Sequence, residues 1–322
     1  MSLWGLTALH DLLILGFLLT LLGCAYTSAP STERSAAISG SSMAIFTLLA
    51  GAAIGRLWTG LPGWLRTAVY RAAAVLSLAQ SYLVLKPLLV AFTSRAYDAP
   101  LLALDHRLFG FTPALWLERF TTPGVVEYFA FFYFSYFPLT FLMVLFVFAR
   151  PVVNAEGTRF GIGTALVMGL GQLGYLVVPA FGPVKYMAAD FAAPLEGGYF
   201  WSLVLGIVDS AGAQRDVFPS LHTAMPTWFA LYAWSEVTRL RRVRDPRASW
   251  WTLAALTITV FALHIIVSTM LLRWHYAIDV VAGLSLAAFA ALVCDPLSRF
   301  DARRREALGV PPAFATGRLT SR

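Results

Sequence analysis

The chain has 322 residues, of which 58% are hydrophobic, 14% aromatic and only 13% charged, with a formal net charge of +7. A soluble domain typically carries about 25% charged residues, so this composition, with a mean hydropathy of +0.70, excludes a soluble or disordered protein. The two cysteines, Cys24 and Cys294, lie near the ends of the first and last apolar segments, and we interpret them as core thiols rather than a disulfide.

Long apolar runs bounded by charged or turn residues predict eight membrane-spanning helices, because a span needs about 20 apolar residues. In chain order they cover 6–26, 36–58, 67–92, 124–149, 160–180, 221–238, 250–272 and 274–293. The first run lacks the basic region of a cleaved signal peptide, so we interpret it as a retained helix. The predicted fold class is an all-α integral membrane protein with about eight transmembrane helices.

The basic residues predict the orientation of these spans. Cytoplasmic connections retain Lys and Arg, and most of the 24 basic residues fall in the even-numbered connections and the C-terminal tail. Both termini are therefore predicted to be cytoplasmic, in a plasma or inner membrane. Topology and anionic headgroups explain this charge, and no basic stripe is interleaved with exposed aromatic residues, so we do not expect nucleic-acid binding.

Two connections on the opposite side are too long to be simple turns. Residues 93–123 contain LLALDHRLFGFTPALWLERF, which has the rough helical period of an interfacial amphipathic helix. Asp105 and His106 within it could cap or shape a lipid entrance. Residues 181–220 are punctuated by Gly and Pro. Loops of this length tend to be functional.

Two of the five histidines begin apolar helices on the same predicted face: His222 in DVFPSLHTAMP and His275 in RWHYAIDVVAG. Asp279 follows His275 by four residues, a spacing that places the carboxylate beside the ring on one helical face. An acid inside a span usually marks a function. The alternative is that Asp279 and His275 simply satisfy one another within the bundle.

Ser220 favours the functional interpretation. It is a good N-cap residue, and the backbone N–H groups after it form an anion site that the helix dipole strengthens. His222 then lies in the first turn, beside any bound phosphate. Phosphoryl transfer through a phosphohistidine needs this combination, since one neutral imidazole attacks phosphorus and a second, protonated imidazole donates to the departing oxygen.

These residues also resemble a known family. FPSLHTA and STMLLRWHYAID resemble the second and third signature motifs of the PAP2 (type 2 phosphatidic acid phosphatase) superfamily. GYLVVPAFGP and LDHRLFGFTPALWLERFTTPGVVEY resemble its inositol phosphorylceramide synthase-like branch. The resemblance covers roughly residues 100–293, and it divides the chain into N-terminal transmembrane helices (1–95), a PAP2-like catalytic domain with a helical-bundle core (96–295) and a basic cytoplasmic tail (296–322).

The resemblance implies a role for each site residue. His275 would be the nucleophile, Asp279 its orienting partner and His222 the general acid, and Ser220 would hold phosphate through its backbone and hydroxyl. No metal or other cofactor is implied. The partners would be the bilayer, a lipid-phosphate substrate and a lipid or water acceptor.

The chain departs from the family pattern in its cations. The third motif usually reads SRxxxxxHxxxD, but Thr269 follows Ser268, and the first motif, KxxxxxxRP, has no match. We expect Lys185 to bind phosphate instead, with Arg273 and then Arg215 as further candidates. Each could be an ordinary loop cation near headgroups, an interpretation we prefer for Arg215. Fewer fixed cations favour a phosphodiester, which carries one negative charge, because buried charge must be paired.

Other polar and aromatic residues favour structural interpretations. His264 lies mid-span and is expected to be a satisfied core histidine. Glu127, Gln172 and Tyr175 could line a headgroup pocket, but packing between helices is the preferred interpretation. The dense aromatic run is most simply an interfacial belt and packing surface; it comprises Tyr128, Phe131, Phe132, Tyr133, Phe134, Tyr136 and Phe137.

Three other classes of protein compete with this interpretation. A zinc hydrolase could use the histidines and Asp279 as ligands, but HExxH and cysteine ligand pairs are missing from the sequence. A serine hydrolase would need a GxSxG elbow, and a transporter should show repeat symmetry and polar residues near the midplane. We therefore predict a membrane phosphotransferase that moves a phosphate-containing headgroup from a phospholipid to a lipid alcohol; the alternative is a lipid phosphate phosphatase using the same residues.

Overall fold

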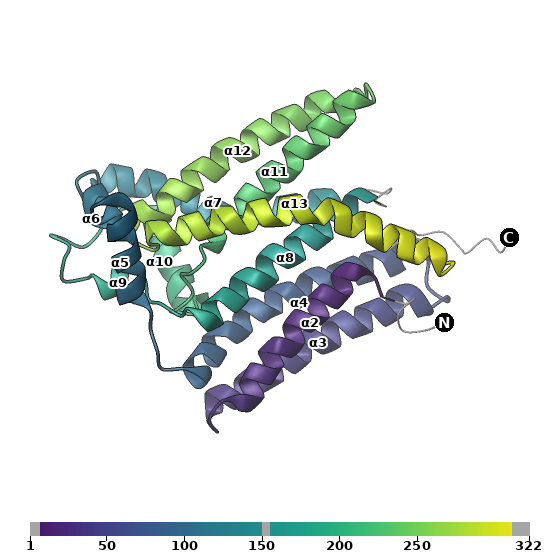
Figure 1. The fold of residues 1–322 in the computed structure, drawn as a ribbon, viewed down its shortest axis with the longest axis horizontal. Helices are drawn as coiled ribbons and strands as arrows, with labels where there is room; N and C mark the ends of the chain where they lie inside the picture. The colour runs from purple at the N-terminus through teal and green to yellow at the C-terminus, as the bar shows by residue number, and fades with distance from the viewer. Residues whose placement is uncertain (1–6, 150–154, 311–322) are drawn as a thin grey trace. The chain divides into compact units, whose positions relative to one another are not determined.

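The computed structural model describes residues 7–149 and 155–310, and the regular structure within them consists of helices and one isolated bridge between Ala180 and Asp216. Figure 1 shows the helices in chain order. Their bounds are α2 (Leu9–Thr27), α3 (Thr32–Leu57), α4 (Gly63–Phe92), α5 (Asp98–Phe109), α6 (Pro113–Glu118), α7 (Pro123–Ala149), α8 (Ala155–Val177), α9 (Pro183–Tyr186), α10 (Tyr199–Ala211), α11 (Leu221–Arg242), α12 (Ala248–Leu271) and α13 (Ala277–Ala307). The predicted all-α class is confirmed.

Among the described residues, seven helices are long and apolar enough to cross a membrane: α2, α3, α4, α7, α8, α12 and α13. The eighth predicted span, 221–238, is helix α11, but it is not among these seven. Its first turns carry polar residues and its last turns carry Glu236 and several arginines, which lower its hydropathy. The prediction of an integral membrane protein is confirmed.

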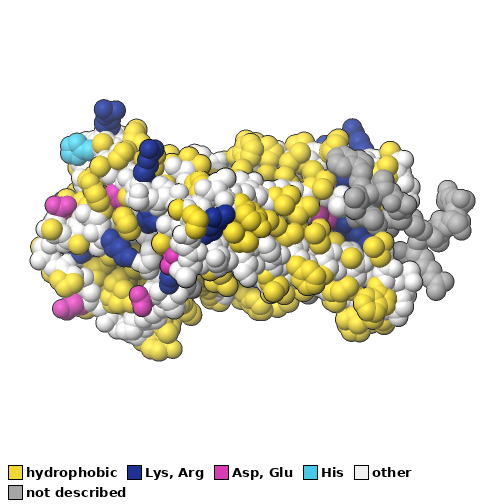
Figure 2. All heavy atoms as spheres, turned by 90° about the horizontal axis from the view of Figure 1, so that it is seen from below, with side chains coloured by type: hydrophobic (Ala, Val, Ile, Leu, Met, Phe, Trp, Pro, Cys, Tyr) yellow, Lys and Arg dark blue, Asp and Glu magenta, His cyan; other side chains and the backbone are white. Residues whose placement is uncertain are grey.

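Large hydrophobic side chains are exposed along the spans, as a lipid environment requires. Trp250 and Leu292 are 75% and 76% exposed, and Trp64 is 70% exposed. Figure 2 shows hydrophobic side chains over much of the visible face, with charged groups only in scattered places.

The chain divides into two compact units: 1–94, 144–169 and 292–322 form the first, and 95–143 with 170–291 form the second. Helices α7, α8 and α13 contribute residues to both units. The division of the chain at 95 and 295 stays a prediction.

In the first unit, α2, α3 and α4 pack against one another, and two glycines of α3 allow the close approach. A Cβ added to Gly51 would lie 2.0 Å from the Cβ of Ala73, and one added to Gly55 would lie 2.7 Å from the Cβ of Tyr70. Small residues at such crossings let helix backbones come together in a membrane.

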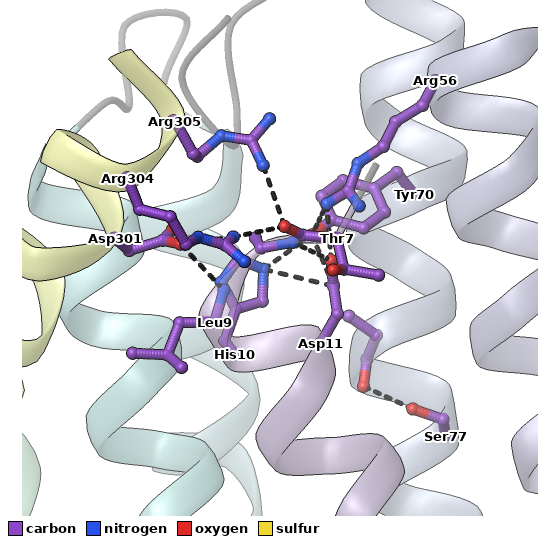
Figure 3. Close-up of polar contacts among 12 residues, drawn as sticks. Thr7, Leu9, His10, Asp11, Arg56, Tyr70, Ser77, Asp301, Arg304 and Arg305 are labelled. Carbon is purple, nitrogen blue, oxygen red and sulfur yellow. Dashed lines mark hydrogen bonds and ion pairs between the residues drawn. The ribbon is translucent and has the colours of Figure 1, made fainter. Parts of the chain in front are cut away.

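A buried polar network, shown in Figure 3, joins the helices of this first unit. The Tyr70 hydroxyl donates to Asp11 Oδ1 (2.6 Å), lies 2.7 Å from His10 Nε2 and accepts from Arg56 Nη2 (2.7 Å). Arg56 also pairs with Asp11 Oδ2 at 2.5 Å. In α13 of the same unit, Asp301 pairs with Arg304 at 2.7 Å and accepts from the backbone N–H of Leu9 at 3.2 Å. We refer to these residues as the first-unit network.

In the second unit, α11 and α12 lie side by side as a hairpin (Figure 1), and three glycines bring other backbones close to the start of α11. A Cβ added to Gly171 would lie 2.4 Å from Leu221, one added to Gly174 would lie 2.3 Å from Pro219, and one added to Gly283 would lie 2.5 Å from the Ser220 carbonyl oxygen. The start of α11 is therefore held tightly between α8 and α13.

Candidate active site

The starts of α11 and α13 meet at Ser220. Its Oγ accepts a hydrogen bond from the Thr223 N–H at 3.2 Å, which is the N-cap geometry expected from the sequence. Its own N–H donates to the Asp279 carbonyl oxygen at 3.0 Å. Ser220 is fully buried. The backbone therefore fixes the first turn of one helix against the first turn of the other.

The turn between α12 and α13 carries His275. The Trp274 N–H bonds to the Thr269 carbonyl oxygen and the Arg273 N–H to that of Met270, a Schellman ending for α12. Arg273 occupies the left-handed position of this motif with a φ of 64°, where glycine is usual. The His275 N–H also bonds to the Thr269 carbonyl oxygen, at 3.1 Å. His275 is thus held against the end of α12.

His275 and Asp279 approach each other, but not as successive turns of one helix. The helix begins at Ala277, so His275 precedes it, whereas the sequence pattern had placed both residues on one helical face. Asp279 Oδ2 accepts the Tyr276 N–H at 2.8 Å and lies 3.3 Å from His275 Nδ1. This is the half of a capping box in which the third helical residue reaches back to the N-cap.

The two imidazoles lie close together, with ring centroids 6.3 Å apart and planes inclined at 49°. His222 stacks on Tyr133 (centroids 4.4 Å apart) and packs against Tyr136 (4.2 Å). A phosphorus atom about to react lies about 3–3.5 Å from its nucleophile. A general acid lies about 2.6–3.2 Å from the oxygen that takes its proton. The 6.3 Å between the ring centroids therefore suits a phosphate group held between the two imidazoles.

Several buried polar atoms here have no hydrogen-bond partner among the described residues: His222 Nε2, Thr223 Oγ1 and Asp279 Oδ1. His275 Nε2 also makes no hydrogen bond within that part of the chain. Buried polar groups are normally satisfied within a folded protein. Their concentration at the start of α11 and α13 indicates a place suited to a polar ligand.

The cations predicted to bind phosphate are engaged elsewhere. Lys185 is exposed on α9 and its Nζ contacts Gln214 Oε1. The Arg273 guanidinium pairs with Glu118 (3.1 Å), donates to the Ala193 carbonyl oxygen (2.8 Å) and stacks on Phe191. Burial lowers the pKa of Arg273, while Glu118 opposes that shift. No hydrogen bond or ion pair joins these two cations to His222 or His275 within the described residues, so their phosphate-binding roles stay predictions.

Three further residues have structural partners. Arg215 is buried and its Nη1 lies 3.4 Å from the Arg95 carbonyl oxygen. Glu127 accepts from the backbone N–H groups of Gly198, Phe200 and Trp201 at the start of α10. Glu127 therefore caps a helix. His264 Nδ1 lies 2.8 Å from the Val260 carbonyl oxygen and its ring stacks on Phe132.

The sequence analysis missed three acids that hold the backbone around His275. Asp105 in α5 accepts the Ala277 and Ile278 N–H groups, Asp98 accepts the Gly182 N–H and the Tyr276 hydroxyl, and Glu118 accepts the Ala192 N–H besides pairing with Arg273. Asp105 had been expected only to shape a lipid entrance. The seven-residue spacing of Asp98 and Asp105 puts both on one helical face, but it identifies none of these partners.

Within the described residues no group of three or more His, Cys, Asp or Glu side chains could hold a metal ion.

The family model of the PAP2 superfamily matches residues 99–293, which include the two histidines, Asp279 and Ser220. No curated protein and no solved structure matches the chain. The family match covers more than half of the sequence, and the chain is therefore a membrane-embedded member of the PAP2 superfamily, whose members are phosphatases and phosphotransferases.

Proposed function

We propose that this protein transfers a phosphate-containing headgroup from a phospholipid to a lipid alcohol through a phosphohistidine at His275. The observation that carries the proposal is the 6.3 Å separation of the His222 and His275 rings, with unpartnered buried polar atoms beside them. Two imidazoles around one phosphate can act as nucleophile and as general acid.

In the first step, His275 Nε2 attacks phosphorus, and an N–P bond forms as the P–O bond to the lipid alcohol breaks. The electron pair of that bond goes to the departing oxygen, which takes a proton from His222. Asp279 supports the attack, because its Oδ2 is 3.3 Å from Nδ1 of the same ring and can orient it. The Ser220 hydroxyl can donate to a phosphate oxygen, because its bond to the Thr223 N–H uses only an acceptor lone pair.

In the second step, the acceptor hydroxyl attacks the phosphohistidine and the N–P bond breaks. The now neutral His222 takes the acceptor proton, which restores both imidazoles to their starting states. An alcohol as acceptor gives a new lipid, and water gives release of the phosphorylated headgroup. With a lipid phosphate monoester as donor and water as acceptor, the same four residues would release inorganic phosphate, so a lipid phosphate phosphatase of the phosphatidate or polyprenyl-phosphate type is the second candidate.

The preference for a phosphodiester donor rests on charge. Arg273 is paired with the acid Glu118, and of these two cations only Lys185, which contacts the neutral Gln214, has a charge without an acidic partner among the described residues, so few fixed cations face a doubly charged monoester. The sequence resemblance to the inositol phosphorylceramide synthase-like branch favours the same choice. We keep Lys185 as a candidate phosphate ligand, since an exposed lysine on a short helix can reorient.

We also propose that the site opens to the extracytoplasmic side and that both termini are cytoplasmic. The distribution of arginines between connections supports this orientation. Accessibility of single cysteines introduced at Asp190 and at Asp245 to an impermeant thiol reagent in intact cells tests it. Labelling only at position 190 is expected, and labelling only at 245 would reverse the orientation.

The functional test offers the purified protein phospholipids labelled in the headgroup phosphate, with and without diacylglycerol or ceramide. Transfer predicts a new labelled lipid that depends on the added alcohol and is lost in His275→Ala. Release of inorganic phosphate from labelled phosphatidate, with no product that depends on the alcohol, would favour the phosphatase. Full turnover by His275→Ala would reject both the transferase and the phosphatase, because each uses His275 as its nucleophile.

A further inference from the structure

The backbone around His275 is held from both sides by one segment of the chain. This segment, residues 98–118, comprises α5, the following turn and α6, and we refer to it as the positioning segment. Its three buried or half-buried acids, Asp98, Asp105 and Glu118, bond to residues immediately before and after His275.

Asp105 acts on the downstream side. Its Oδ2 accepts the Ala277 N–H at 2.9 Å and its Oδ1 accepts the Ile278 N–H at 2.7 Å. These are the first two N–H groups of α13, which an N-cap side chain from the same helix would normally satisfy. Asp105 is fully buried, and burial raises the pKa of its carboxyl although these two N–H groups lower it. The start of α13 therefore depends on a carboxylate supplied by another helix.

Glu118 acts on the upstream side, through Arg273. Arg273 is 5% exposed, and its guanidinium pairs with Glu118 and donates to the Ala193 carbonyl oxygen. Arg273 nevertheless occupies a left-handed backbone position, which is unfavourable for an L-residue and easily adopted by glycine. A non-glycine residue at this position is explained if its side chain is needed for the pairing.

Asp98 joins the two sides. It accepts the Gly182 N–H at 2.8 Å and the Tyr276 hydroxyl at 2.9 Å. The Val184 N–H in turn donates to the Arg273 carbonyl oxygen at 2.7 Å. The turn at 182–184 and the residues flanking His275 are thus tied to the same segment.

We propose that the positioning segment sets the place of the His275 ring relative to His222, and that Asp105 and Arg273 are positioning residues. Arg273 then acts through Glu118 and does not grip phosphate. The inference rests on the proposed function, because it concerns the nucleophile of that reaction. It adds Asp98, Asp105 and Glu118, which lie outside the second and third signature motifs, and gives Arg273 a role other than binding phosphate.

The first test replaces Asp105 by Asn, which keeps the shape of the side chain but presents an NH₂ to one of the two backbone donors. Turnover of headgroup-labelled phospholipid in micelles is measured per mole of folded enzyme. We expect kcat to fall roughly 10–100-fold with little change in KM, since a misplaced nucleophile loses rate without losing substrate affinity. Asp190→Asn, at an exposed loop acid, is the matched control.

The second test replaces Arg273 by Gly, which suits the left-handed turn and removes the side chain that carries the guanidinium. Positioning predicts a fall in kcat of about 10-fold or more and an inhibition constant for inorganic phosphate that changes by less than about twofold. A phosphate-gripping Arg273 predicts a large rise in that constant, which would overturn the inference. An unchanged kcat would overturn it as well, and this variant decides alone if Asp105→Asn fails to fold.

His275→Ala, measured in parallel, separates the two proposals. If it is inactive while Asp105→Asn and Arg273→Gly match Asp190→Asn, only the positioning inference fails. If His275→Ala keeps its turnover, the proposed function fails and the inference with it.

Discussion

The two units of this chain each bury a polar cluster, and the clusters differ in how their charges are paired. In the first-unit network, the carboxylates of Asp11 and Asp301 each meet an arginine at 2.5–2.7 Å. In the second unit, Asp279 meets only His275 and a backbone N–H among the described residues, and His222 makes no hydrogen bond there. A carboxylate that forms an ion pair with an arginine is typical of a structural contact, whereas a buried carboxylate whose only side-chain partner is a histidine is typical of a catalytic site.

Removing the nucleophile gives the largest expected effect. We expect His275→Ala to lower kcat at least about 10⁴-fold, because the covalent route is lost. Expression and thermal stability should change little, since Nε2 of this ring makes no hydrogen bond within the described residues. Turnover of headgroup-labelled phospholipid in micelles checks this, with Asp190→Asn as control. Retained turnover would show that the cluster of His222, His275 and Asp279 is structural, like the first-unit network.

Removing the proposed general acid comes next. We expect His222→Ala to lower kcat about 10²–10⁴-fold, and a donor with a better leaving group should recover much of that loss, because it needs no protonation. The control is His264→Ala, at a histidine outside the site. Equal sensitivity of the variant to good and poor leaving groups would argue against proton donation by His222.

The orienting carboxylate should matter less than either imidazole. Loss of such a carboxylate can cost about 10⁴-fold in a triad, but the 3.3 Å separation from His275 is long, so we expect about 10²-fold for Asp279→Asn. The pH dependence of kcat distinguishes this role from packing. A carboxylate that acts on the imidazole changes the low-pH side of the kcat profile when it is replaced, and a packing residue does not. An unchanged rate would reduce the pair to a structural contact.

Substitutions in the first-unit network should lower stability and leave kcat unchanged, the opposite of substitutions at the histidines. Tyr70→Phe removes one hydroxyl that contacts His10, Asp11 and Arg56. We expect a loss of about 1–3 kcal/mol in the free energy of unfolding, seen as a lower midpoint in detergent, with kcat per folded enzyme unchanged. A matching fall in kcat without loss of stability would contradict the division into structural and chemical clusters.

The fold was largely predictable because a membrane imposes long apolar runs, and the first seven predicted spans each begin and end within about five residues of a helix. The last helix differs more, since it runs from 277 to 307 and the predicted span was 274–293. The candidate pair His222 and His275 could also be identified from the sequence, because each lies beside the start of a helix that turn residues predict. The start of α13 was misplaced because the apolar run continues upstream to Trp274, while the helix begins only where Asp105 supplies partners for the first N–H groups.

The positioning contacts could not be predicted, because they depend on tertiary structure. Nothing local to Asp98 or Glu118 indicates that one accepts the Tyr276 hydroxyl and the other pairs with Arg273.

The most direct test of the central claim is to trap the covalent intermediate. The enzyme is mixed with phospholipid labelled in its headgroup phosphate, quenched in alkali within a turnover, and mapped by peptide mass spectrometry. The account predicts an acid-labile adduct on His275 that accumulates when the acceptor alcohol is withheld. Label on another residue, or full turnover with no adduct at any time, would contradict it.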